Sequence, residues 1–387
     1  MSWNEATIMD QRIRFVVSAV QQTASMTGLC EEYDITRPTG YLWLGRYRRG
    51  GFAALADTSH RPYTSPARTA AALEDRVLEL RQQYGWGGKK LVYLLSPNEQ
   101  LSVPTINRIL KRRGQVPPAN RHPPATQRFE RDLPNQLWQM DFKGQFPMRQ
   151  GWCYPLSVLD DHSRFALGLV ALSNTSTDWV WPSLVAVFRA YGLPDAMLMD
   201  HGEPWWGSAN GYGLTMLAVR LLQQGIVVIH GAMAHPQTQG KVERFHRTLD
   251  EAMRRQRPMP DQLAGWAQRL AEFRTLYNTV RPHEALAMAT PASCYQASAR
   301  PYVEQPPAWV YPADLTVRTV DQLGMLSEQG HRYFVCEALV GQPVGVEVVG
   351  EALLVRYRDL YIREINTATG RSTPLHCRIT EPHKAHV

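Results

Sequence analysis

The sequence predicts a multidomain protein with all-α modules at its N-terminal end, a central α/β domain built on a mixed sheet, and a small β-barrel at its C-terminal end. Three observations support this prediction. Apolar residues recur at helical spacing through the first third of the chain, and strand patterns alternate with helical ones in the middle. The last part is dense in valine, tyrosine and short alternating runs. A chain of 387 residues is also longer than one hydrophobic core usually takes.

The excess positive charge lies entirely in the N-terminal third. Residues 1–130 hold 18 Lys and Arg against 11 Asp and Glu, and the remaining 24 and 24 cancel, which leaves the net +7 of the whole chain. This asymmetry indicates a polyanion-binding module joined to a neutral body. The five cysteines contain no C-x-x-C pair, so neither a zinc site nor a disulfide framework is indicated. The longest apolar run, "FALGLVAL", is too short to span a bilayer, and no signal-peptide core precedes it, so we expect a cytoplasmic protein without a membrane partner.

Residues 1–65 are predicted to form a helix-turn-helix domain. The stretch "ITRPTGYLWLGRYRRGG" offers Thr36 as an N-cap and Pro38 in the first turn of a helix that ends at Gly50 and Gly51. A basic, aromatic helix after a turn suits the major groove of DNA. The candidate DNA contacts are Arg46, Arg48 and Arg49. The alternative is an ordinary small helical bundle with a charged face.

Residues 66–120 repeat the pattern and are predicted to form a second helix-turn-helix domain. In "LSVPTINRILKRRG", Ser102 can cap a recognition helix over residues 103–113. Its candidate DNA contacts are Asn107, Arg108, Lys111 and Arg112. Lysine and arginine at the end of a helix also suit its dipole, which is the structural alternative. A proline-rich linker over residues 121–135 follows.

The pattern changes to strands in residues 136–298. "QLWQMDFKGQF" alternates as a strand, and "YPLSVLDDHSRFALGLVALS" predicts a hairpin. Helical and strand patterns then alternate, which is typical of a mixed sheet flanked by helices. After a second linker over residues 299–308, five short strand patterns in residues 309–380 predict the small barrel.

Three carboxylates of the central domain are candidates for catalysis. Asp141 lies in the first strand, Asp200 ends the short strand "AMLMD", and Glu243 lies in the first turn of the helix "GKVERFHRTLDEAMRRQ". Reactive groups gather at the ends of parallel strands. Three carboxylates at one point would repel one another unless hard divalent cations neutralise them. Two Mg²⁺ ions about 4 Å apart, with Mn²⁺ as a substitute, can bind the entering and leaving oxygens of a phosphodiester.

Each of these residues has a plainer interpretation as well. Glu243 alone is typical of a solvated helical glutamate, four residues before Arg247 at ion-pair spacing. If Glu243 does lie beside DNA, its basic neighbours should contact phosphates, and these are Lys241, Arg244, His246 and Arg247. Asp160 and Asp161, adjacent in a hairpin turn, are expected to accept backbone hydrogen bonds rather than to serve as the second catalytic carboxylate.

Five ordered motifs resemble a known family. "LWQMDF", "LDDHSRFALG", "MDHGEPW", "HPQTQGKVERFHRTL" and "YNTVRPHEALAMATPASCY" match, in order, the landmarks of the integrase-core transposases of bacterial insertion sequences. The most similar branch is the insertion-sequence four-eighty-one group. The resemblance covers the whole chain in outline and residues 130–298 in detail.

The resemblance implies a ribonuclease H-like core whose Asp-Asp-Glu triad is Asp141, Asp200 and Glu243, with Asp141 bridging two Mg²⁺ ions and the other two residues binding one each. It implies helix-turn-helix domains that read terminal inverted repeats, and a C-terminal barrel that contacts DNA or partner subunits. The implied partners are double-stranded DNA of the element ends and target, with a homodimer or higher oligomer on that DNA. The implied activity is 3′-end cleavage followed by strand transfer, in a bacterial, nucleoid-associated protein.

Two departures from the family pattern concern the surroundings of the triad. His201 stands where the family usually has Asn, and 42 residues separate Asp200 from Glu243, which is more than the usual spacing. Neither change removes a carboxylate, but the role of His201 stays open between metal surroundings, DNA contact and neither. Two other functions also stay open. One is a DNA-binding repressor of transposition with a degenerate core, and the other is a simple nuclease without joining activity.

Overall fold

The computed structural model describes residues 7–57, 68–116, 130–202, 204–207, 214–230 and 240–378. The chain divides into two compact units, Met1–Ala70 and Ala71–Val387. Most of the predicted linker over residues 121–135 lies outside the described residues. Of the helices that can be described, none combines the length and apolar character needed to cross a membrane.

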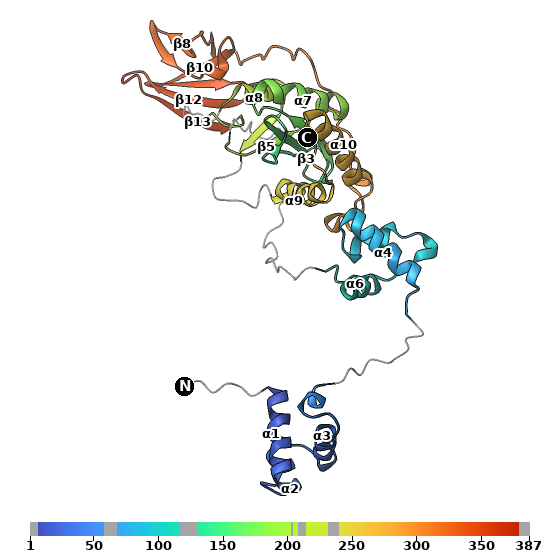
Figure 1. Ribbon diagram of the computed structural model, residues 1–387. Helices are drawn as coiled ribbons and strands as arrows, with labels where there is room; N and C mark the ends of the chain where they lie inside the picture. Colours follow the sequence, from blue (N-terminus) through green and yellow to red (C-terminus); the bar gives the residue numbers. More distant parts are fainter. Residues whose placement is uncertain are drawn as a thin grey trace, which may run out of the picture. The chain divides into compact units, whose positions relative to one another are not determined.

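The first unit is a three-helix module. Its helices are α1 (Ile8–Gln21), α2 (Met26–Glu32) and α3 (Arg37–Gly50), followed by the 3₁₀ turn η1 (Phe52–Leu55) (Figure 1). The helices enclose a small core of Phe15, Val16, Leu29, Cys30 and Leu55. Gly40 lets α3 approach closely, because a Cβ there would lie 2.7 Å from Cys30 Sγ. The predicted start of α3 at Thr36 is confirmed.

A second helical module begins the second unit. It contains α4 (Ala71–Tyr84), α5 (Gly88–Leu91), η2 (Val92–Leu94), η3 (Pro97–Glu99) and α6 (Val103–Arg112). Apolar side chains of α4 and α6 share a core that includes Val77, Leu80, Ile106 and Ile109. Ser102 caps α6, as the sequence predicts, and its hydroxyl accepts a hydrogen bond from the Thr105 amide.

The central domain is built on a six-stranded mixed sheet. Its strands are β1 (Trp138–Phe142), β2 (Phe146–Pro147), β3 (Trp152–Asp160), β4 (Ala166–Leu172), β5 (Ala196–Met199) and β6 (Val227–His230). The strands follow the order β4-β3-β1-β5-β6, and β2 pairs with the start of β3. The pairs β1–β3 and β3–β4 are antiparallel, whereas β1–β5 and β5–β6 are parallel. The predicted mixed sheet is therefore confirmed.

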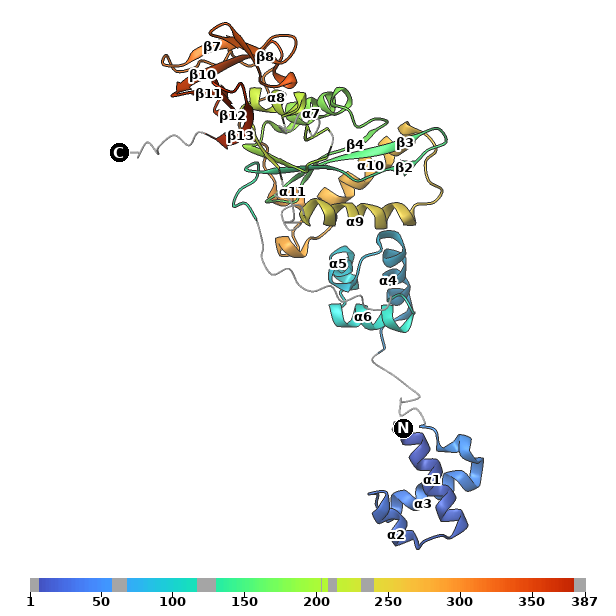
Figure 2. The same ribbon diagram turned by 90° about the vertical axis from the view of Figure 1, so that its left-hand side faces the viewer.

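Helices cover both faces of this sheet. They are α7 (Thr177–Tyr191), α8 (Met216–Gln223), α9 (Gly240–Arg255), α10 (Leu263–Thr279), η5 (Glu284–Leu286) and α11 (Pro291–Cys294). Side chains of α7 and α8 share one core with β1 and β3, while α9 and α10 share another with β3 and β4. Figure 2 shows α7 and α8 on one side of the sheet and α9 on the other.

The C-terminal domain corrects the prediction of a small β-barrel. Its strands are β7 (Thr316–Thr319), β8 (Met325–Glu328), β9 (His331–Phe334), β10 (Pro343–Val349), β11 (Ala352–Tyr357), β12 (Leu360–Asn366) and β13 (Ser372–Arg378), with η6 (Glu337–Leu339) before β10. Five of them form an antiparallel sheet in the order β13-β12-β11-β10-β7, so the described sheet is open and ends at β13 and β7.

Packing of a separate hairpin explains how this open sheet obtains a core. Leu326 of β8 and Tyr333 of β9 join one buried cluster with Val344, Val355 and Ile365 of the sheet. The β8–β9 hairpin therefore covers apolar side chains that closure of a barrel would otherwise bury. The same cluster includes Val219 of α8, which joins this domain to the central one.

Candidate active site

Two of the predicted catalytic aspartates lie side by side on parallel strands. In the β1–β5 register Gln139 is opposite Leu198, so two residues further along Asp141 comes level with Asp200, the residue after β5. Both side chains are partly exposed. Parallel strands that end at one edge bring their last side chains together, and this is the edge at which the two carboxylates lie.

Glu243 extends this acidic region from α9. Val242, Phe245 and Leu249 bury one face of α9 against the sheet, while Glu243 in its first turn is exposed. Burial, the negative charge of Asp200 and that of Glu243 raise the pKa of Asp141 to about 7, against an opposing hydrogen bond from the Phe142 amide. The three carboxylates therefore act on one another electrostatically, as like charges at close range do.

The chemistry of these donors fits a hard divalent cation, but their arrangement is not a formed metal site. Carboxylate oxygens are the ligands that Mg²⁺ prefers, and a cation would relieve the repulsion that raises the pKa of Asp141. Within the described ranges, however, no group of three or more His, Cys, Asp or Glu residues is placed so that it could hold a metal ion. Binding of a metal ion at these residues therefore requires a different arrangement of the three carboxylate side chains.

His246 lies next to Asp141 and was misjudged from the sequence. It is buried, its Nε2 lies 2.9 Å from Ser157 Oγ, and its Nδ1 lies 3.8 Å from Asp141 Oδ2. Burial and the charge of Lys143 lower the pKa of His246 to about 3, so the imidazole is neutral at physiological pH. The prediction that His246 is a cation facing DNA is therefore wrong. Its place one turn after Val242, on the apolar stripe of α9, was the signal for burial.

A group of aromatic rings surrounds Asp200. The ring centroids of His201 and Trp206 are 4.8 Å apart, as are those of Trp206 and His230, and the Nδ1 atom of His230 lies 3.1 Å from the Asp200 carbonyl oxygen. These rings line a cavity of about 420 Å³, to which Leu360 of β12 contributes from the C-terminal domain. His201 thus lies against aromatic neighbours, beside the backbone of Asp200.

The adjacent carboxylates of the hairpin turn are satisfied by hydrogen bonds. Asp160 accepts bonds from the Asn135 amide at 2.8 Å and from both the amide and the hydroxyl of Ser163. Asp161 accepts bonds from the Arg131 amide at 2.9 Å and from Gln139 Nε2 at 2.8 Å. Both aspartates are fully buried, so they hold the turn in place, as the sequence predicts.

The basic residues near Glu243 fall into two groups. Lys241 is mostly buried, and its Nζ lies 2.6 Å from Asp161 Oδ2, so it pairs within the protein. Burial lowers the pKa of Lys241, and its bond to Asp161 opposes that shift. Arg244 and Arg247 are exposed on α9. Of the predicted phosphate contacts on this helix, these two arginines are the exposed ones, and their contact with DNA stays a prediction.

The predicted DNA contacts of α3 lie near its C-terminal end. Arg48 and Arg49 are exposed, and the Nε of Arg49 donates to the Gly45 carbonyl at 3.2 Å. Arg46 is half-buried, and its guanidinium lies 4.7 Å from the centre of the Trp43 ring, from which the guanidinium of Arg12 lies 4.1 Å away. Arg46 is thus engaged in a cation–π contact within the module.

All four predicted contacts on α6 are exposed, and three of them also have partners within the module. Arg108 donates to Thr105 Oγ1, Arg112 pairs with the buried Glu74, and the Asn107 side chain lies against Gly88, where a Cβ would be 2.4 Å from its Oδ1. Lys111 is exposed.

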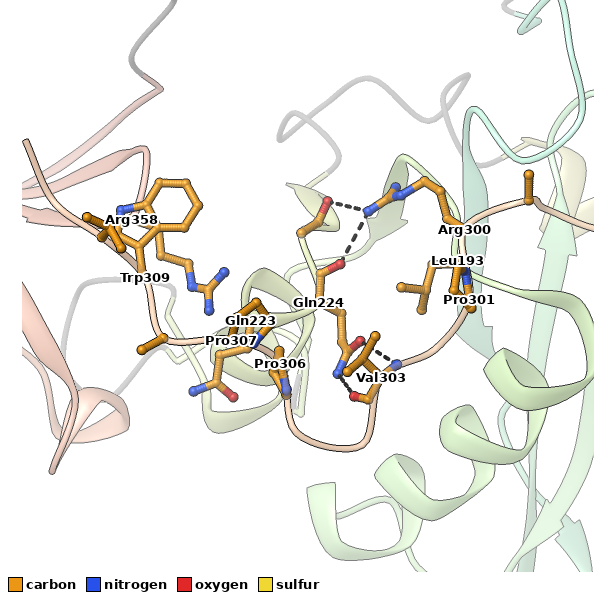
Figure 3. A pocket seen from close by; sticks show the side chains of 14 residues that line it. Leu193, Gln223, Gln224, Arg300, Pro301, Val303, Pro306, Pro307, Trp309 and Arg358 are labelled. Carbon is orange, nitrogen blue, oxygen red and sulfur yellow. Dashed lines mark hydrogen bonds between the residues drawn. The ribbon is translucent and has the colours of Figure 1, made fainter.

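A larger pocket lies apart from the carboxylates, where the chain leaves the central domain. It has a volume of about 630 Å³, and residues of the predicted 299–308 linker line it together with Gln223, Gln224 and Arg358 (Figure 3). Gln224 Nε2 donates to the Val303 carbonyl at 2.7 Å, and Arg300 donates to the Gly225 carbonyl at 2.9 Å. The linker is therefore held against the end of α8.

Comparisons with known proteins agree with this architecture. Two family models, both described as an integrase core domain, match residues 131–211 and 224–291. A homeodomain-like domain matches residues 39–110, and a helix-turn-helix domain matches residues 11–63. The Gag-Pol polyprotein of baboon endogenous virus (strain M7) is 26% identical over 183 residues, which are 45% of this chain and 10% of the polyprotein. That of feline leukemia virus is 27% identical over 120 residues, 31% of this chain and 7% of the polyprotein.

Solved structures of viral integrases are also similar, at low identity. The simian T-cell lymphotropic virus intasome in complex with PP2A regulatory subunit B56 gamma aligns with 79% of this chain and 100% of that chain, at 13% identity and a TM-score of 0.39. The BIV integrase catalytic core aligns with 42% of this chain and 93% of that chain, at 19% identity and a TM-score of 0.32.

The chain thus combines helix-turn-helix domains with an integrase core domain. This combination supports an integrase/transposase family. The chain spans a tenth or less of the length of the two viral polyproteins, so their whole activities do not carry over.

Proposed function

We propose that the chain is a DNA transposase of a bacterial insertion sequence, close to the four-eighty-one group. It binds terminal inverted repeats and catalyses Mg²⁺-dependent 3′-end cleavage and strand transfer. The observation that carries this proposal is the electrostatic convergence of Asp141, Asp200 and Glu243, from two strands and one helix, within an integrase core. The family models for helix-turn-helix domains support the DNA-binding part.

In this proposal the three carboxylates hold two Mg²⁺ ions, for which Mn²⁺ can substitute. When bound, the ions would stabilise negative charge on the entering and leaving oxygens of a phosphodiester. Asp141 would provide oxygens to both ions, and Asp200 and Glu243 to one each. The chain's own residues then bind and orient the DNA strand. Exposed Arg244 and Arg247 lie on the same helix as Glu243, where phosphates of that strand would pass.

DNA binding and assembly complete the proposal. The two helical modules bind the element ends, the core acts on element and target DNA, and two or more copies join on paired ends. The protein would then work in the bacterial cytoplasm, on the nucleoid. Inverted repeats that flank the coding region would supply the DNA with which each of these statements can be tested.

The decisive experiment compares wild type with Glu243→Gln on linear DNA that carries the two repeats. We expect the variant to bind this DNA normally and to lose cleavage and strand transfer by about 10³-fold or more, because a metal ligand contributes several kcal/mol to transition-state stabilisation. EDTA should abolish both reactions of the wild type. Glu251→Gln, an exposed glutamate two turns further along α9, is the matched control and should keep full activity. Equal activity of wild type and Glu243→Gln would refute the assignment of the triad.

A DNA-binding repressor of transposition with a degenerate core is the second candidate, because the helix-turn-helix models support DNA binding in either case. The repressor would be supported if wild type and Glu243→Gln both bind repeat DNA but neither cleaves it with Mg²⁺ or Mn²⁺. Cleaved ends without joined products would instead indicate a simple nuclease.

A further inference from the structure

Three polar side chains from separate parts of the core meet behind the acidic region. Lys241 Nζ of α9 lies 2.6 Å from Asp161 Oδ2 and 3.1 Å from the Asp161 carbonyl oxygen. Gln139 Nε2 of β1 donates to Asp161 Oδ1 at 2.8 Å. Gln139 Oε1 accepts a hydrogen bond from the Val242 amide at 3.3 Å. These bonds connect Gln139, Asp161 and Lys241 into one network, called here the Gln139–Asp161–Lys241 clamp.

The clamp residues are buried, so their polar groups have few other partners to which they could turn. Gln139 and Asp161 are fully buried, and the Lys241 side chain is 15% exposed. In such surroundings a charged hydrogen bond is stronger than in water, and an unpaired group is costly. The carboxamide of Gln139 also satisfies one of the amides that the first turn of a helix leaves without an intrahelical partner. The start of α9 is therefore bonded to β1 and to the hairpin turn.

Two residues of the clamp lie close in the chain to two of the proposed metal ligands, Asp141 and Glu243. Gln139 precedes Asp141 by two residues on β1, and alternate residues of a strand face the same side of a sheet. Lys241 precedes Glu243 by two residues in the first turn of α9. A displacement of α9 relative to β1 would change the separation of Asp141 and Glu243, and the clamp bonds resist that displacement.

We propose that the Gln139–Asp161–Lys241 clamp is a positioning device that sets the distance of Glu243 from the two aspartates. Lys241 then acts through Asp161 rather than on a DNA phosphate, unlike the exposed Arg244 on the same turn. This inference rests on the proposed function, because it concerns the metal affinity of the same carboxylates. Residues that orient metal ligands typically change metal affinity by about 10–100-fold when they are replaced.

Two measurements separate positioning from phosphate contact. The first is Mn²⁺ binding to the DNA-free protein, followed by the paramagnetic resonance signal of free Mn²⁺. The second is affinity for repeat DNA as a function of salt. Lys241→Met should weaken Mn²⁺ binding by about tenfold or more and leave the salt dependence unchanged. The matched control Arg244→Met should keep the Mn²⁺ affinity and lower the salt slope by about one.

Further variants keep the test decisive. Asp161→Asn keeps one acceptor oxygen, replaces the other with an amide donor and removes the charge. It should weaken Mn²⁺ binding as well, so it carries the test if Lys241→Met does not fold. Lys241→Met combined with Asp161→Asn should be no worse than the stronger single change, since both remove the same ion pair between Lys241 and Asp161. Lys241→Arg, which keeps the charge, should recover part of the affinity.

The outcomes distinguish the clamp from the function on which it rests. Suppose that the wild type binds Mn²⁺ and joins DNA, and that Lys241→Met and Asp161→Asn both keep the wild-type Mn²⁺ affinity. That result would overturn the clamp proposal alone and leave the proposed function intact. A reduced salt slope for Lys241→Met would overturn it too. Wild type that neither binds Mn²⁺ nor cleaves DNA would refute the proposed function, and the clamp with it.

Discussion

The helices α3 and α6 both end in neighbouring basic residues, but the two modules hold these side chains differently. In α3, Arg48 and Arg49 are exposed, and the described bond of Arg49 is to its own helix at Gly45. In α6, Arg112 and Arg113 both pair with Glu74, a fully buried carboxylate in the first turn of α4. The positive charge of Arg112 and Arg113 at the end of α6 therefore neutralises a carboxylate that is buried inside the module.

This difference shows that a basic helix end does not by itself define a DNA-binding surface. Arginine at the end of a helix has the same favourable relation to the helix dipole in both modules. What separates them is a carboxylate 38 residues away from Arg112 in the chain. The arginines of both modules are exposed, but in the second module Arg112 and Arg113 also neutralise the buried Glu74. We therefore expect the two modules to respond differently to substitution.

The largest effect should come from Glu74→Gln. It leaves two guanidinium groups without their buried partner and should lower the free energy of opening of the second module by about 3 kcal/mol. Hydrogen exchange of the α4 and α6 amides in the full chain measures this locally. Glu79→Gln on the same helix is the control, since Glu79 is exposed and pairs with Arg76 only at the surface, and it should change little. Equal effects of the two substitutions would show that Glu74 is not a structural anchor.

Substitution of the arginines themselves should separate DNA contact from structural pairing. Arg48→Ala and Arg49→Ala should each weaken DNA binding by about 1 kcal/mol and lower the slope of log affinity against log salt by about one. Arg112→Ala should leave the slope unchanged and reduce the exchange protection of α4 instead. Titrations at several salt concentrations check both statements. A slope for Arg112→Ala as low as that for Arg48→Ala would remove the distinction between the modules.

The sequence predicts local structure here better than it predicts partners. The cap at Ser102, the hairpin around Asp160, the position of Asp141 within a strand and that of Asp200 at a strand end follow from spacing and residue type. These features depend on neighbours in the chain. The pairing of Lys241 with Asp161 does not follow, since 80 residues separate them and only the fold brings them together.

Helix α10 was not predicted from the sequence, and a closed barrel in the C-terminal domain was wrongly predicted, for different reasons. In α10, Trp266, Leu270, Phe273 and Tyr277 are buried at helical spacing, so the signal was present in the sequence. Closure of the C-terminal sheet had no such signal. Alternating runs predict strands, but whether the first strand pairs with the last depends on register and on what covers the sheet. The β8–β9 hairpin supplies that cover.

Lys90, in α5 of the second module, gives this module a pH dependence. Burial and the charge of Arg281 lower the pKa of Lys90 to about 8 from its usual 10.5. Between these values the folded state binds fewer protons than the unfolded state, so stability should rise as pH rises through this window. Below pH 8 the penalty is fully present, and Lys90→Met should stabilise the protein by about 1 kcal/mol once solvent screening is allowed for.

Thermal unfolding of Lys90→Met and wild type at pH 7 and near pH 10.5 measures this difference, which should vanish at the higher pH. Lys89→Met is the matched control, because Lys89 is exposed and pairs with Glu284 at 3.1 Å. It should show no such gain at pH 7. A stability gain for Lys90→Met that persists unchanged at high pH would mean that apolar packing, not the buried charge, is the cause.

The smallest effects concern the caps of the two compared helices. Ser102 Oγ accepts a hydrogen bond from the Thr105 amide at the start of α6, whereas Thr36 makes no side-chain cap bond to α3 and its Oγ1 lies 2.9 Å from Thr39 Oγ1. Ser102→Ala should therefore cost about 1 kcal/mol and Thr36→Ala less than about 0.5 kcal/mol. Hydrogen exchange of α6 and α3 in the full chain measures each helix separately. Both substitutions remove one hydroxyl from an N-cap, so their costs in stability can be compared directly. A cost for Thr36→Ala as large as that for Ser102→Ala would show that α3 depends on its cap in solution. The two helices would then begin in the same way although they end differently.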